Sequence, residues 1–157
     1  SLNKAAQLEP NNGMVINNQG ALESKKSNYG QAATLYAKAK NLGMDVDYNL
    51  GITKLATSKY DQALSLLGNR KCNSNIALAQ LMTKKYDEAA ASLKCAPETA
   101  DNYYLLAVTG ARKADAKMVI DNLTKAISMD PTLKTQALED REFVKFFTSP
   151  EFMALVK

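Results

Sequence analysis

A short pattern that recurs along the chain constrains the fold more than any other feature. Residues 29–32, 60–63 and 86–89 each read Tyr, any residue, Gln or Glu, then Ala. A large side chain, Tyr36, Leu67 or Leu93, follows each copy. Self-similarity at a period of roughly 20–50 residues is typical of arrays of one repeated structural unit. The sequence therefore predicts an array, with a degenerate fourth copy over residues 116–126.

A small residue precedes each copy and indicates what the unit is. These residues are Gly20, Gly51, Ala77 and Ala107. Their spacing predicts a helix, a tight turn and a second helix, with the small residue facing the repeated alanine so that the two backbones approach closely. The large residues would fill the space between successive hairpins. We expect helices near residues 14–25, 29–41, 45–57, 60–67, 73–84, 86–95, 101–113 and 116–128.

Composition agrees with a folded helical chain. Apolar residues make up 46% of the sequence, which is enough for a core, while the few glycines and prolines favour helix over sheet. The net charge is +4. Its basic residues are scattered, whereas a nucleic-acid surface concentrates them in a stripe, so we expect no nucleic-acid partner. No apolar stretch approaches the roughly 20 residues of a membrane helix, so we expect no membrane insertion.

Two segments carry a resemblance to a known family. Residues 13–44 contain Gly20, Tyr29, Ala32, Tyr36 and Ala39, and residues 100–133 contain Tyr103, Leu106, Ala107, Val119, Leu123, Ala126 and Pro131. The chain in this respect resembles the tetratricopeptide repeat (TPR) family. The resemblance implies an all-α, right-handed superhelix of about four hairpins. We expect a single domain over residues 1–157, with the end of a preceding repeat at 1–12, repeats at 13–43, 44–69, 70–99 and 100–133, and a C-terminal cap at 134–157.

The C-terminal segment departs from the repeat. Its phenylalanines, Phe143, Phe146 and Phe147, cluster before Ser149-Pro150, which predicts a helix start with proline in the first turn. A terminal repeat must cover an exposed core, so a cap is expected rather than a partner-binding patch. The segment also resembles the ends of TPR regions in bacterial cell-envelope proteins. That resemblance alone suggests an envelope or periplasmic location.

Catalytic chemistry has little support in the sequence. The chain has no histidine, the commonest general base and zinc ligand. We find no phosphate-binding loop, dinucleotide-binding turn or nucleophile elbow. We therefore expect no enzyme activity, no cofactor and no metal site.

Two cysteines, Cys72 and Cys95, lie near the start and the end of the third predicted hairpin. Such positions come opposite each other in an antiparallel helix pair, so a disulfide would form in an oxidising compartment. Two partly buried thiols packed as small apolar side chains are the alternative. The sequence leaves both open.

The TPR resemblance also implies a binding face, because the first helices of TPR hairpins line a concave groove. We expect a protein or peptide segment as the partner, held by amides that match a peptide backbone and by tyrosines. The alternative is a structural spacer within a longer cell-envelope protein. The candidate groove residues are Asn17, Asn18, Tyr48, Asn49, Lys71, Asn75 and Tyr104.

Overall fold

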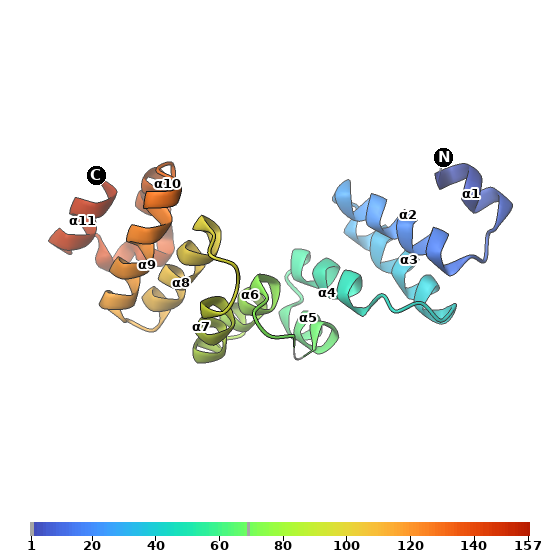
Figure 1. Cartoon of the computed structure of the whole chain (residues 1–157), viewed down its shortest axis with the longest axis horizontal. Coiled ribbons are helices and arrows are strands. Elements are labelled where there is room, and N and C mark those ends of the chain that lie inside the picture. The colour runs from blue at the N-terminus through green and yellow to red at the C-terminus, as the bar shows by residue number, and fades with distance from the viewer. Residues whose placement is uncertain (1, 69) are drawn as a thin grey trace. The chain divides into compact units, whose positions relative to one another are not determined.

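The computed structural model describes residues 2–68 and 70–157, and every regular element in them is a helix (Figure 1). The chain divides into two compact units: unit 1, Ser1–Asn69, and unit 2, Arg70–Lys157. Unit 1 contains α1 (Leu2–Leu8), α2 (Gly13–Lys25), α3 (Tyr29–Asn41), α4 (Asp47–Ala56) and α5 (Tyr60–Leu67). Unit 2 contains α6 (Ser74–Met82), α7 (Tyr86–Lys94), α8 (Ala100–Arg112), α9 (Ala116–Met129), α10 (Leu133–Glu139), the 3-10 helix η1 (Arg141–Phe146) and α11 (Pro150–Val156).

Consecutive helices pack as hairpins. In unit 1 the pairs are α2 with α3 and α4 with α5, and in unit 2 they are α6 with α7 and α8 with α9. The expected all-α class is confirmed, and the eight helices of the hairpins begin and end close to the predicted positions. α10 was not predicted, because the repeat pattern that located the other helices ends before it.

The four hairpins share one turn geometry. In each, the residue two positions before the second helix has a positive φ: Ser27, Ser58, Lys84 and Ala114. The next residue donates its backbone N–H to a carbonyl five residues earlier, as from Asn28 to Glu23 at 2.9 Å and from Asp115 to Gly110 at 2.9 Å. This is the Schellman ending of a helix, in which glycine is the usual left-handed residue. Here serine, lysine or alanine adopts that conformation.

Polar side chains set where several helices begin. The Asn12 side chain accepts from the N–H groups of Met14 and Val15, and Asn73 does the same for Asn75 and Ile76. Such caps satisfy N–H groups that have no partner inside the helix. Ser149 caps α11 by accepting from Phe152 N–H, with Pro150 in the first turn, as the sequence predicted.

In two of the hairpins, the small residue of the first helix makes a contact that was not expected. A side-chain carbon added at Gly20 would lie 2.7 Å from the Tyr36 ring, and one added at Gly51 would lie 2.8 Å from Leu67. In these two hairpins, the small residue of the first helix therefore lies against the large residue of the second helix. The large residue needs that gap because its side chain enters the hairpin interface, rather than only the space between hairpins.

The core of unit 2 extends into the C-terminal segment. Phe143 and Phe152 are fully buried in one cluster with side chains of α8 and α9. Their rings lie 5.6 Å apart. This burial agrees with the expected cap. In unit 1 a smaller cluster joins Ile16, Tyr36 and Val46 with two alanines.

Candidate functional site

The candidate groove residues of unit 1 lie on its two first helices. Asn17 and Asn18 are on α2, and Tyr48 and Asn49 are on α4. Asn49 Nδ2 donates to Asn17 Oδ1 at 3.1 Å, so the two half-buried amides join successive hairpins. Asn18 is exposed, and 36% of Tyr48 is exposed. We call Asn17, Asn18 and Asn49 the unit 1 amide face.

The Asn17–Asn49 bond leaves hydrogen-bonding capacity unused. It occupies one donor of Asn49 and one lone pair of Asn17, whereas each amide offers two donors and a two-lone-pair acceptor. The Asn17 amino group and the Asn49 carbonyl oxygen therefore remain as a donor and an acceptor. A peptide backbone presents the complementary carbonyl and N–H groups.

Two candidates of unit 2 lie around the start of α6. Lys71 is exposed in the loop before this helix, and Asn75 is half-buried in its first turn. Asn75 N–H donates to the capping side chain of Asn73 at 3.0 Å. Asn75 thus lies in the first turn of its helix, as Asn49 does in α4, whereas Asn17 and Asn18 lie in the middle of α2.

The structure corrects the expectation for Tyr104, which we placed in the groove. Only 7% of this residue is exposed. Its hydroxyl donates to Asp140 Oδ2 at 2.8 Å, and its ring packs edge-on against Phe143 with the centroids 5.6 Å apart. Burial, followed by the contact with Asp140, raises the pKa of Tyr104 well above its ordinary value. Tyr104 therefore serves the cap and does not present an anchor to a partner.

Arg112 makes a second contact with the cap that the sequence did not suggest. Its guanidinium donates from Nε and Nη2 to both carboxylate oxygens of Glu142, at 2.9 and 2.6 Å, and from Nη1 to the carbonyl of Leu81 at 3.2 Å. Paired donation of this kind is the strong geometry for an arginine–carboxylate pair. It lowers the pKa of Glu142 and raises that of Arg112. The pair thus joins α6, α8 and η1.

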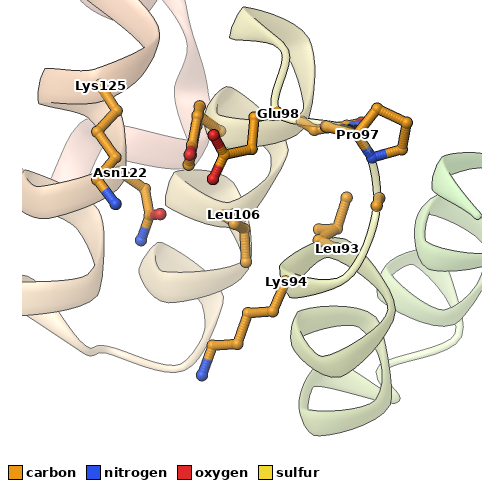
Figure 2. Close-up of a pocket in the computed structure, with 10 residues that line it drawn as sticks. Leu93, Lys94, Pro97, Glu98, Leu106, Asn122 and Lys125 are labelled. Atoms are coloured by element: carbon orange, nitrogen blue, oxygen red, sulfur yellow. Dashed lines mark hydrogen bonds between the residues drawn. The ribbon is translucent and has the colours of Figure 1, made fainter. Parts of the chain in front are cut away.

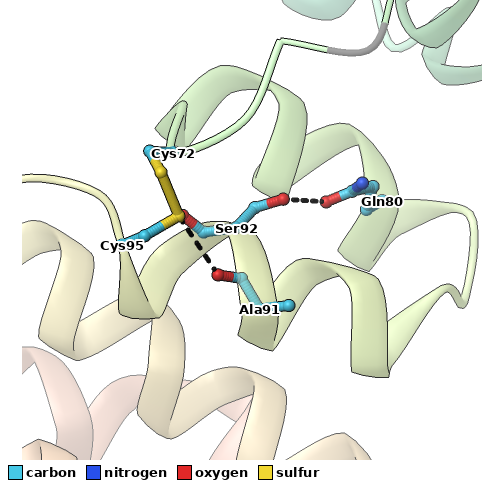
Figure 3. The surroundings of a disulfide bond; sticks show 5 residues. All are labelled: Cys72, Gln80, Ala91, Ser92 and Cys95. Carbon is cyan, nitrogen blue, oxygen red and sulfur yellow. Dashed lines mark hydrogen bonds between the residues drawn. A yellow bond between two sulfur atoms is a disulfide. The ribbon is translucent and has the colours of Figure 1, made fainter.

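The two cysteines form a disulfide, shown in Figure 3. It connects Cys72, just before α6, to Cys95, just after α7, with the Cα atoms 4.7 Å apart. Between the same two helices, the Ser92 hydroxyl donates to Gln80 Oε1 at 2.9 Å. The disulfide closes the third hairpin at its open end, because the turn lies at the other.

A cavity of about 220 Å³ lies in unit 2, among α7, α8, α9 and the loop after α7 (Figure 2). Leu93, Ala96 and Leu106 give it apolar walls, and Lys94 and Lys125 bring positive charge. Sequence reasoning did not find it, because its residues come from three helices whose relative placement no local pattern encodes.

The described residues contain neither a membrane-spanning helix nor a cluster of metal-ligating side chains. Over residues 2–68 and 70–157, no helix is long and apolar enough to cross a membrane. In the same part of the chain, no three acidic, cysteine or histidine side chains gather in a way that could hold a metal ion.

The comparison with known proteins adds nothing to the geometry described above. No protein-family model matches the chain, and a search of curated proteins found no matching sequence.

Proposed function

We propose that the chain is a TPR-like superhelical scaffold that binds a segment of another protein along its first helices, without catalysis, cofactor or nucleic acid. The repeated hairpin supports the architecture, since four copies share one turn and two of them show the same contact between a glycine and a large residue. The Asn17–Asn49 pair carries the binding proposal. It joins two successive first helices and retains a donor and an acceptor for a peptide backbone.

Each unit has its own candidate contacts. In unit 1 the amide face would bind the peptide backbone, with Tyr48 adding apolar area beside it. Lys71 and Asn75 remain candidate contacts in unit 2. Tyr104 is withdrawn, because the cap already covers it.

A structural module within a longer cell-envelope protein is the second candidate, and Tyr104 favours it. This first-helix residue contacts Phe143 and Asp140 of the same chain. The contacts support a role in which the first helices pack against other parts of the same protein and bind no partner. The disulfide supports an oxidising compartment such as the bacterial periplasm, because disulfides persist mainly there. We propose this location for either role.

Site-specific crosslinking tests the binding proposal. A photo-reactive residue would replace Asn18 on α2, and in a separate variant Gln31 on α3; both side chains are exposed amides of unit 1. In the cells that naturally make the protein, we expect defined protein adducts from position 18 and not from position 31.

A second pair of variants tests the amides themselves. Asn49→Ala should reduce the adducts from position 18 several-fold, because an unmet hydrogen bond in a buried contact costs about 1–3 kcal/mol. Gln62→Ala removes an exposed amide of α5 and should leave them unchanged. Equal adducts from positions 18 and 31, or none from position 18, would contradict the proposal and favour the structural module.

A further inference from the structure

The cavity of unit 2 has an apolar part and a polar part. Its apolar floor comes from three buried residues, Leu93 on α7, Leu106 on α8 and Ala96 in the connecting loop. Its polar side chains stand around these: Figure 2 shows Lys94 reaching from α7, and Asn122 and Lys125 from α9. A binding site for an amphipathic group has this arrangement, in which apolar walls provide affinity and a few polar groups fix orientation.

Positive charge predominates around the cavity. Lys94 and Lys125 lie on different helices, and within the described part of the chain neither forms an ion pair with a carboxylate. The Lys125 ammonium instead lies over the Tyr103 ring, 5.1 Å from its centroid. The cavity also has one carboxylate, Glu98, whose proximity raises the pKa of Tyr103, so the two lysines outnumber the acidic groups. Two lysines thus remain for an incoming anion.

The wall formed by the loop after α7 is held in place from several sides. Asn102 Nδ2 donates to the Pro97 carbonyl at 2.8 Å, and Ala96 N–H donates to the Leu93 carbonyl at 3.1 Å. Cys95, between two lining residues, is tied to Cys72 by the disulfide. A wall fixed before binding loses little freedom when a ligand arrives, which favours affinity.

The size of the cavity indicates the class of occupant. Its volume of about 220 Å³ is below the roughly 300–1,000 Å³ of small-molecule and cofactor sites. One side chain of a protein partner suits it better than a whole cofactor. The lysines on two helices would then neutralise acidic groups on either side of that side chain.

We propose that this cavity is a docking site for an acidic segment of another protein, in which one aliphatic side chain lies over Leu93 and Leu106 and flanking carboxylates meet Lys94 and Lys125. The site lies on residues of α7, α8 and α9 that the proposed groove does not use. Its success or failure is therefore independent of the unit 1 amide face.

Nuclear magnetic resonance titration of the whole, isotope-labelled chain tests the proposal. The probe is a blocked peptide, Gly-Glu-Leu-Glu-Gly. We expect saturable shifts of the resonances of Leu93, Leu106 and Asn122, with an affinity that falls as salt is added, because exposed charges are screened. Peptides with Lys-Leu-Lys or Glu-Ser-Glu at the centre should give no saturable shift there.

Charge reversal supplies the matched variants. Lys94→Glu with Lys125→Glu should weaken binding at least about tenfold, because like charges then face each other across the contact. Lys59→Glu with Lys145→Glu makes the same change in net charge at exposed residues outside the cavity and should leave binding intact. Helical circular dichroism verifies that both variants fold. Absence of a saturable shift with the acidic peptide, equal binding of the Lys-Leu-Lys peptide, or full binding by the cavity variant would overturn the proposal.

Discussion

Unit 1 and unit 2 are built from the same hairpin but differ in what holds the hairpins closed. Both have the Schellman turn, with Ser27 in one and Ala114 in the other adopting the left-handed conformation. Unit 2 adds a disulfide across its first hairpin and a phenylalanine-rich cap over its second. In unit 1, α1 packs against α2, and α2 is joined to α4 by the Asn17–Asn49 hydrogen bond. The repeat pattern thus builds the hairpin, while closure of unit 2 depends on the disulfide and on the C-terminal cap, which the pattern does not include.

The comparison has a consequence for stability and for binding. In repeat arrays, each unit is stabilised by its own packing and by its neighbours. We therefore expect unit 2 to open at a higher free energy than unit 1. The less closed unit is also the one with unused donors and acceptors on its first helices.

The largest effect should come from the cap. Phe143→Ala removes a fully buried ring and should cost about 3–5 kcal/mol of unfolding free energy, mostly in unit 2. Urea denaturation followed by circular dichroism measures the loss. Val144→Ala is the control, because Val144 lies next to Phe143 in sequence but is 57% exposed. This substitution should change the free energy of unfolding by less than about 0.5 kcal/mol. Similar losses from both variants would show that the phenylalanine does not close unit 2.

Breaking the disulfide should have the next largest effect. The bond closes a loop with a sequence separation of 23 residues, and the chain-entropy model assigns such a loop about 3 kcal/mol. Cys72→Ser with Cys95→Ser should lower the melting temperature, and a reductant should then have no further effect. The wild-type protein should lose the same stability on reduction. An unchanged melting temperature would show that the disulfide does not contribute to the difference in stability between the units.

A glycine in unit 1 tests the contact between the small and the large residue of a hairpin. Gly51→Leu places a side chain against Leu67 and should cost about 1–3 kcal/mol through overpacking. Gly30→Leu is the control, since nothing lies within 4 Å of a side-chain carbon built at this position of α3. It should be neutral or stabilising, because leucine favours helix over glycine by up to about 1 kcal/mol. Equal denaturation midpoints for both variants would contradict the packing of the hairpin.

The smallest expected effect is the pH dependence of the Arg112–Glu142 pair. The hydrogen bonds from Arg112 lower the pKa of Glu142 in the folded chain. The pair therefore stabilises unit 2 fully above the ordinary range of glutamate pKa values, and this stability is lost as pH falls through the lowered pKa. Melting temperatures across the acid range should fall less steeply for Glu142→Gln than for the wild type. Glu139→Gln, which removes an exposed carboxylate of α10, should keep the wild-type slope.

The hairpins could be predicted because their signals are local. Gly20 and Tyr36 lie in one short stretch of sequence, and the fixed spacing of such small and large residues indicates both helices. The contact of the glycine with the large residue was not predicted, since the spacing does not say which side chains of the second helix meet the glycine. The left-handed turn residues could not be found either, because serine and lysine carry no preference for that conformation comparable to glycine's.

The candidate site was harder to predict, because its contacts join distant parts of the chain. Tyr104 resembles a groove tyrosine by its position in the repeat, yet its partner Asp140 lies 36 residues away in a segment with no repeat. The Arg112–Glu142 pair and the lysines around the unit 2 cavity pose the same problem. Asn17 and Asn49 were proposed from their helical positions, and their mutual hydrogen bond followed only from the packing of two hairpins.

Native-state hydrogen exchange tests most directly the claim that hairpins of the same kind are held closed more firmly in unit 2 than in unit 1. Mass spectrometry of the oxidised protein compares the amides of α2 and α3 with those of α8 and α9, which are equivalent helices of the two units. Exchange reports the free energy of local opening. We predict slower exchange in α8 and α9, and a smaller difference from α2 and α3 in Phe143→Ala. Equal protection in both hairpins, or slower exchange in α2 and α3, would contradict the account.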